Sequence, residues 1–103
     1  MKNAYFQQGD CLIKPVTGIP AEAKETNERV LVEGEHTGHA HRVARNAAAA
    51  VLIAGAMRYL RVDAPTPIEH EEHKTIILPP GTYQIDQVRE YDHFKEESRA
   101  VMD

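Results

Sequence analysis

Residues 47–62 have the sequence AAAAVLIAGAMRYLRV, and this stretch decides the fold class. One interpretation is a helix from Ala47 to Leu60. Alanine is the strongest helix former, and Asn46 just before the run is a common helix cap. Against it, Gly55 stands in the centre of that helix, where glycine is unfavourable by about 1 kcal/mol relative to alanine.

The second interpretation is a β-hairpin. Val51–Ala54 and Met57–Val62 have the character of two strands, and the two residues between them begin with glycine. A two-residue loop with glycine first is typical of a type II′ turn, which suits the twist of paired strands. We favour the hairpin, with the alanine run as an irregular lead-in or a single helical turn.

Other short apolar runs bounded by glycine or proline predict further strands. We expect no strand in Asp63–Pro67, because two prolines interrupt a ladder of hydrogen bonds. The charged tail, residues 92–103, is expected to be flexible or to form a short helix. The chain is then a single all-β domain over residues 1–103, a small antiparallel β-barrel or rolled sheet. Its further expected strands are Cys11–Val16, Arg29–Glu33, His39–Ala44, Lys74–Leu78 and Thr82–Tyr91.

Composition narrows the function classes. The chain has 103 residues, 42% of them hydrophobic, and a formal charge of −4, which argues against a nucleic-acid partner. No apolar run approaches the ~20 residues of a membrane span, and no secretory leader is visible, so we expect a cytoplasmic protein. Its one cysteine, Cys11, lies on an apolar strand, where a buried small side chain is a commoner role than a nucleophile. Exposed edge strands favour a homodimer.

Two histidine-rich segments carry the chemistry. The first is Gly34–His41, with the sequence GEHTGHAH, which holds three of the six histidines. In a strand, residues two apart point the same way, so His39 and His41 share one face. The second segment is His70-Glu71-Glu72-His73. Its histidines are three apart, one residue short of the zincin helix motif, and the neighbouring Pro67 favours a loop.

We expect the two segments to meet in space and to hold a divalent metal ion. The predicted ligands are His39, His41, His70 and His73, with His36 either reaching the same site or capping its turn. Glu71 or Glu72 would be a ligand, a partner that orients an imidazole, or a general base, and we assign the catalytic role to Glu72. Nitrogen and oxygen ligands suit zinc, iron, nickel, copper or manganese. The alternative is that these segments are solvated loops whose histidines are structural.

The same residues resemble the cupins. That family carries a glycine and a His-x-His pair, and later a Pro-x-Gly turn, as do Gly34, His39, His41 and Pro79-Pro80-Gly81 here. The resemblance implies a β-barrel with a metal at its mouth. The family's glutamate and its last histidine are absent, since Arg45, Asn46 and Gln84 stand near those positions, so only His39 and His41 carry over. The chain also resembles small uncharacterised bacterial or phage proteins.

Two functions follow as predictions. The first is a divalent-metal-binding protein, which on the cupin resemblance would be a metalloenzyme acting on a small-molecule substrate. The second is a non-enzymatic interaction module, an accessory factor of a mobile element, with structural histidines. Neither the substrate nor the identity of the metal follows from the sequence.

Overall fold

The computed structural model describes residues 5–34 and 38–88, and in these residues the hairpin is present. Strands β6 (Ala49–Ala54) and β7 (Met57–Val62) pair antiparallel, and Ala54 faces Met57 across the turn. Gly55 has φ +62°, as the glycine-first turn requires. The alternative helix over residues 47–60 is therefore wrong, because residues 49–54 pair with the whole of β7 instead.

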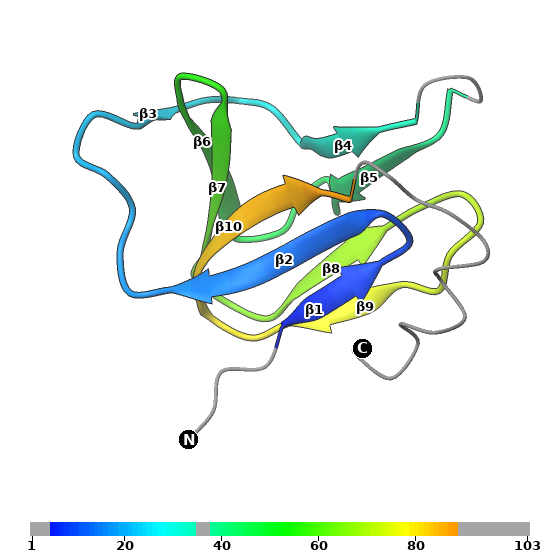
Figure 1. Cartoon of the computed structure of the whole chain (residues 1–103). Coiled ribbons are helices and arrows are strands. Elements are labelled where there is room, and N and C mark those ends of the chain that lie inside the picture. The colour runs from blue at the N-terminus through cyan, green and yellow to red at the C-terminus, as the bar shows by residue number, and fades with distance from the viewer. Residues whose placement is uncertain (1–4, 35–37, 89–103) are drawn as a thin grey trace.

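This hairpin is part of a six-stranded antiparallel sheet, the larger of two (Figure 1). The sheet has the order β1-β2-β10-β7-β6-β3, so the last described strand lies between an early strand and the hairpin. The pairing of β10 with both neighbours runs without a register shift. Its other strands are β1 (Phe6–Gln8), β2 (Cys11–Val16), β3 (Lys24–Glu25) and β10 (Gly81–Gln87).

The second sheet has four short strands in the order β4-β5-β8-β9. A register shift between Val30 and Val32 marks an irregularity in its first strand. All four strands are antiparallel to their neighbours. Their bounds are β4 (Val30–Glu33), β5 (Ala40–Val43), β8 (Thr66–Glu69) and β9 (Ile76–Leu78).

The core lies between the two sheets. Apolar side chains at alternate positions of a strand point to the same face, and β2, β7 and β10 each have two buried residues that are two positions apart. The second sheet contributes buried residues of its own, and removal of this apolar surface from water is the main stabilising term. The fully buried side chains that join the sheets are Cys11, Ile13, Val51, Leu60, Ile68 and Leu78.

The main error of the sequence prediction concerns β8. Asp63–Pro67 was predicted to be a connection without a strand. Pro67 lies inside this strand and faces Ile77 of β9. Proline lacks the backbone N–H donor but keeps its carbonyl oxygen. The carbonyl oxygen of Pro67 accepts a hydrogen bond from the Ala44 amide at 3.0 Å. The ladder with β5 uses Ile68 and Glu69, so the missing N–H falls outside that ladder.

The prediction of an all-β antiparallel fold is confirmed, as a pair of sheets rather than one closed barrel. The expected C-terminal helix and tail, residues 92–103, lie outside the described residues. Both sheets end in edge strands within the described chain, and the homodimer that such edges favour stays a prediction.

Candidate metal centre

The antiparallel pairing of β5 with β8 brings the two histidine segments together. Arg42 faces Glu69 in that pairing, so the residue after β8 comes beside the start of β5. The ring centroids of His41 and His70 are 4.2 Å apart, and those of His39 and His70 are 5.6 Å apart. His36 lies outside the described residues.

His73 joins the same cluster. Its ring centroid is 4.7 Å from that of His70 and 5.8 Å from that of His41. Imidazoles bound to one ion through nitrogens at ~2.0–2.1 Å have centroids about 5 Å apart, which is close to these spacings. Of the four rings, His39 and His70 have ligating atoms in a group of three that lies within 4.8 Å. We call His39, His41, His70 and His73 the imidazole cluster. The structure places all four predicted ligands in it, while their binding of a metal stays a prediction.

Glu71 adds a carboxylate to His39 and His70 of the cluster. Atoms of His39, His70 and Glu71 that are able to ligate a metal lie within 4.8 Å of one another. The Glu71 oxygens accept hydrogen bonds from the Ala40 amide at 3.0 Å and from the Arg42 guanidinium at 2.9 Å. These two donors lower the pKa of Glu71 to about 2, so the carboxylate is ionised at neutral pH.

Glu72, the predicted catalytic residue, is more distant. Its side chain is 68% exposed, and its Oε2 lies 3.7 Å from Nδ1 of His39. The neighbouring Glu71 is therefore the better ligand on geometry. Glu72 is placed at the solvent side of His39, which leaves the general-base assignment as a prediction.

His70 also has a structural contact. Its Nδ1 accepts hydrogen bonds from the backbone amides of Glu72 at 3.0 Å and His73 at 3.3 Å. These bonds close the turn that follows β8. Burial lowers the pKa of His70, and the neighbouring His73 lowers it further. A metal ion bound at Nδ1 of His70 would replace these two amide bonds.

The tip of the β1–β2 hairpin completes the cluster, and sequence reasoning missed it. Gln8 is buried, and its Nε2 donates to the carbonyl oxygens of Ile68 and Lys74, both at 2.9 Å. These two residues flank the loop that carries His70 and His73. The Oε1 of Gln8 lies 2.7 Å from Nδ1 of His41. One amide thus joins the hairpin, the loop and β5.

Gly9, next to Gln8, allows the hairpin to approach the cluster. Its φ is +59°, a region that favours glycine. A Cβ at this position would lie 2.5 Å from Nε2 of His73, closer than real contacts allow. The signal for this contribution was present in the sequence, because Gly9-Asp10 between Gln8 and Cys11 has the same two-residue layout as Gly55-Ala56.

His41 is the most enclosed of the four rings, with 2% of its surface exposed. Its Nε2 is 3.1 Å from Oδ1 of Asp10. Burial lowers the pKa of His41 and the neighbouring His70 lowers it too, while the bond to Asp10 opposes the change. The other oxygen of Asp10, Oδ2, accepts a hydrogen bond from the Gln87 amide at 3.0 Å.

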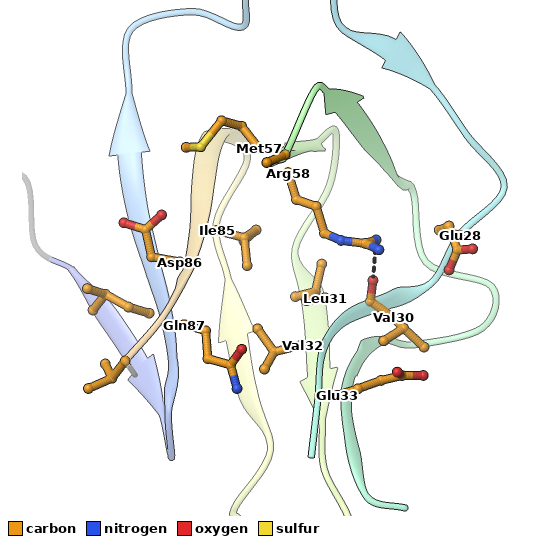
Figure 2. A pocket seen from close by; sticks show the side chains of 13 residues that line it. Glu28, Val30, Leu31, Val32, Glu33, Met57, Arg58, Ile85, Asp86 and Gln87 are labelled. Carbon is orange, nitrogen blue, oxygen red and sulfur yellow. Dashed lines mark hydrogen bonds between the residues drawn. The ribbon is translucent and has the colours of Figure 1, made fainter. Parts of the chain in front are cut away.

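A groove of about 780 Å³ lies elsewhere, between β4 and the β7–β10 pair, and no histidine of the described residues lines it. Figure 2 shows its apolar side chains, among them Leu31, Val32 and Ile85. In the same view the Arg58 guanidinium reaches the carbonyl oxygen of Val30, at 3.2 Å. Its charged side chains are Glu28, Glu33, Arg58 and Asp86.

Cys11 is not placed for nucleophilic chemistry. It has no exposed surface, and burial followed by the charge of Asp10 raises the pKa of its thiol to about 12. Because the thiolate is the reactive form, the side chain acts as a small buried hydrophobe in the core.

These features define a two-sheet antiparallel β protein with a buried-to-exposed cluster of imidazoles and carboxylates. The chain belongs to the family described as Domain of unknown function (DUF8820), whose model matches residues 7–88. That description names no activity or ligand, so it adds nothing to the resemblance to cupins. No curated protein and no solved structure matches the chain. In residues 5–34 and 38–88, no helix has the length and apolar character that crossing a membrane would need.

Proposed function

We propose that this protein binds a divalent transition-metal ion at the imidazole cluster. The observation that carries the proposal is the group formed by His39, His70 and Glu71, whose ligating atoms lie within 4.8 Å of one another. Two further imidazoles adjoin that group, at centroid distances of 4.2 Å for His41 and 4.7 Å for His73 from His70. Four such rings exceed what closing one loop requires.

The donor set selects the kind of ion. Imidazole nitrogen and carboxylate oxygen suit zinc, iron, nickel, copper and manganese in the divalent state. The ionised Glu71 adds a negative charge that offsets part of the ion's charge. Glu71 already accepts two hydrogen bonds, which orient its oxygens as the partners of metal-bound carboxylates commonly do.

The position of the cluster favours a reactive centre over a closed structural one. The side chains of His39 and Glu72 are 29% and 68% exposed, so one side of the group faces solvent. A metal with an open position there would act as a Lewis acid or activate bound water. We propose Glu72, whose Oε2 lies 3.7 Å from Nδ1 of His39, as the base for such a water, and a small molecule as the substrate.

Metal analysis of protein purified without a histidine tag tests the proposal. We expect one equivalent of bound Zn²⁺ or Co²⁺ after dialysis against the metal, and a loss of at least tenfold in affinity in His39→Asn and His70→Asn. Glu71→Gln and Glu25→Gln form a matched pair, because each carboxylate accepts a bond from an arginine, at 2.9 Å and 3.2 Å. Only Glu71→Gln should weaken binding. Absence of stoichiometric metal in the unaltered protein would overturn the proposal.

A second candidate, an interaction module with structural histidines, is favoured by one observation. Nδ1 of His70 accepts two backbone hydrogen bonds, a role that requires no metal. On this account the unaltered protein binds no metal, and a chelator leaves its melting temperature unchanged. His70→Asn then lowers the melting temperature equally with and without added Zn²⁺, whereas a metal site predicts a larger loss when Zn²⁺ is present.

A further inference from the structure

The groove between β4 and the β7–β10 pair has an apolar floor and a polar rim. Leu31, Val32 and Ile85 line it and are 3%, 7% and 5% exposed, so they form its floor. The lining residues with the greatest exposure are polar or small, and they form the rim. The volume of about 780 Å³ lies within the roughly 300–1,000 Å³ that is usual for ligand sites.

One side of the groove is formed by an end strand. In the part of the chain that the structure describes, β4 is hydrogen-bonded to one other strand, β5. The carbonyl oxygen of Val30 in β4 accepts a hydrogen bond at 3.2 Å from Arg58 of β7, which reaches across the groove (Figure 2). A backbone group of β4 is therefore directed towards the groove. End strands with accessible backbone are the elements to which extended peptides add.

The charged side chains of the groove are mostly acidic, with three carboxylates and one guanidinium. Asp86 pairs with Lys14 at 2.7 Å. Glu28 and Glu33 are exposed, and neither forms an ion pair with another residue of 5–34 or 38–88. They stand five residues apart on either side of β4, a span of at most about 17 Å at the rise of a strand. Two cations with a similar spacing would complement them.

The chain itself supplies little of the complementary charge. Its formal charge is −4, which a second copy shares. Residues 89–103 follow Val88 of the groove lining, and they include three basic and five acidic side chains. Because like charges across an interface are unfavourable, charge complementarity favours a basic partner over either of these occupants.

We propose that the groove binds an extended peptide segment of another protein, in which two basic residues about five positions apart flank apolar ones. The basic side chains pair with Glu28 and Glu33, and the apolar ones cover Leu31, Val32 and Ile85. The peptide backbone forms hydrogen bonds with the free edge of β4. This inference is independent of the proposed metal ion, because the groove is lined by none of the histidines that the structure describes.

Methyl NMR spectra of the full chain, with capped synthetic peptides as probes, test the proposal. One set of peptides has two lysines separated by three to five valine and threonine residues, and a matched set has glutamate in place of lysine. We expect the lysine set to shift the resonances of Val30, Val32, Met57 and Ile85 to saturation, and the glutamate set to leave them unchanged. Affinity should decrease with added salt, which screens exposed charges. The proposal is overturned if no lysine peptide shifts these resonances.

Two double variants that remove equal charge test the contact with the carboxylates. Glu28→Gln with Glu33→Gln changes the groove, and Glu22→Gln with Glu69→Gln changes exposed carboxylates that do not line it. Since exposed ion pairs contribute little individually, we expect the first double variant to bind the lysine peptides about fivefold more weakly. The second should bind as the unaltered protein does. Equal weakening in both would assign the effect to net charge and overturn the proposal.

Two other occupants give distinct results in the absence of peptide. Groove methyl resonances that shift with protein concentration would show that a second copy fills the groove. A shift of the same resonances in Phe94→Ala would show that residues 89–103 fill it. Either result overturns this proposal and leaves the proposed metal site intact, since uptake of Co²⁺ is measured separately.

Discussion

The groove and the imidazole cluster show that volume and chemistry lie in different places in this molecule. The groove encloses about 780 Å³, and two of its four charged side chains have partners, Arg58 the Val30 carbonyl and Asp86 the Lys14 ammonium. The cluster has nitrogen and carboxylate oxygen atoms converging within 4.8 Å. Convergence of atoms able to ligate a metal, rather than the size of a cavity, marks the candidate site.

A chain of contacts links the two regions. Gln87 lines the groove, and its amide donates to Asp10, which in turn lies against His41. The comparison can be tested by changing matched residues on either side of this contact.

The largest effect on stability is expected from Gln8→Leu. The substitution leaves the carbonyl oxygens of Ile68 and Lys74 and the Nδ1 proton of His41 without partners. Since each unsatisfied buried polar group costs about 1–3 kcal/mol, we expect a loss of about 3 kcal/mol or more in urea unfolding. Gln87→Leu, which removes one exposed bond beside the groove, should cost less than about 1 kcal/mol. Equal losses of stability in Gln8→Leu and Gln87→Leu would contradict this difference between the cluster and the groove.

Gly9→Ala and Gly55→Ala form the next comparison. Both glycines have similar positive φ, +59° and +62°, so the backbone strain of about 1–2 kcal/mol should be shared. A Cβ at Gly55 meets nothing within 4 Å, whereas one at Gly9 collides with His73. We therefore expect similar losses of stability in thermal unfolding, and weaker Co²⁺ binding in Gly9→Ala alone. Weaker binding in both would assign the effect to general destabilisation.

The metal-free protein should lose stability as the pH falls below 6.5. Burial, together with neighbouring imidazoles, lowers the pKa values of His41 and His70 from 6.5. Between the lowered values and 6.5, the unfolded chain binds more protons than the folded one, so stability decreases with decreasing pH. Urea unfolding with a chelator at pH 7.5 and pH 5.5 measures the change. His70→Asn should flatten the dependence, and an increase of stability towards pH 5.5 would contradict the prediction.

The smallest effect is expected at the ion pair between Lys14 and Asp86, whose atoms are 2.7 Å apart beside the groove. Both side chains are about 30% exposed, at 28% and 30%. Solvent-exposed pairs contribute about 0–1 kcal/mol and weaken with salt. Lys14→Met should therefore change the unfolding free energy by less than about 1 kcal/mol, with a smaller change in 1 M salt. A larger loss that is independent of salt would point to packing instead.

The sequence was sufficient for features that depend on neighbouring residues. Gly55 between two apolar runs predicted the β6–β7 hairpin, and the density of histidines in residues 34–41 and 70–73 predicted the segments that converge. Pro67 led to an error, because it argued against a strand that the structure contains. A proline lacks the backbone N–H donor, but this does not exclude a strand in which that donor lies outside the hydrogen-bonded ladder. In each case the local rule was sound, and the pairing of strands decided its outcome.

The parts of the site that sequence reasoning missed depend on register over long distances. The bond between Gln8 and His41 spans 33 residues, and that between Gln8 and Lys74 spans 66. A glutamine before a turn is commonplace, and only the docking of the hairpin against β5 and β8 gives it three specific partners. The choice between Glu71 and Glu72 likewise depends on which side chain meets Arg42, and spacing within the loop does not determine this.

The three bonds of the Gln8 amide have a consequence for how the molecule assembles. Two of them join the described N-terminal hairpin to Ile68 and Lys74, which follow Gln8 by 60 and 66 residues. We expect contacts of such separation to form late in folding, because loop closure opposes them. We expect competence for Co²⁺ to arise in the final step of refolding, after most strand signal in circular dichroism has returned. Absorption bands of bound Co²⁺ that appear together with the first strands would show that the histidines assemble without the hairpin.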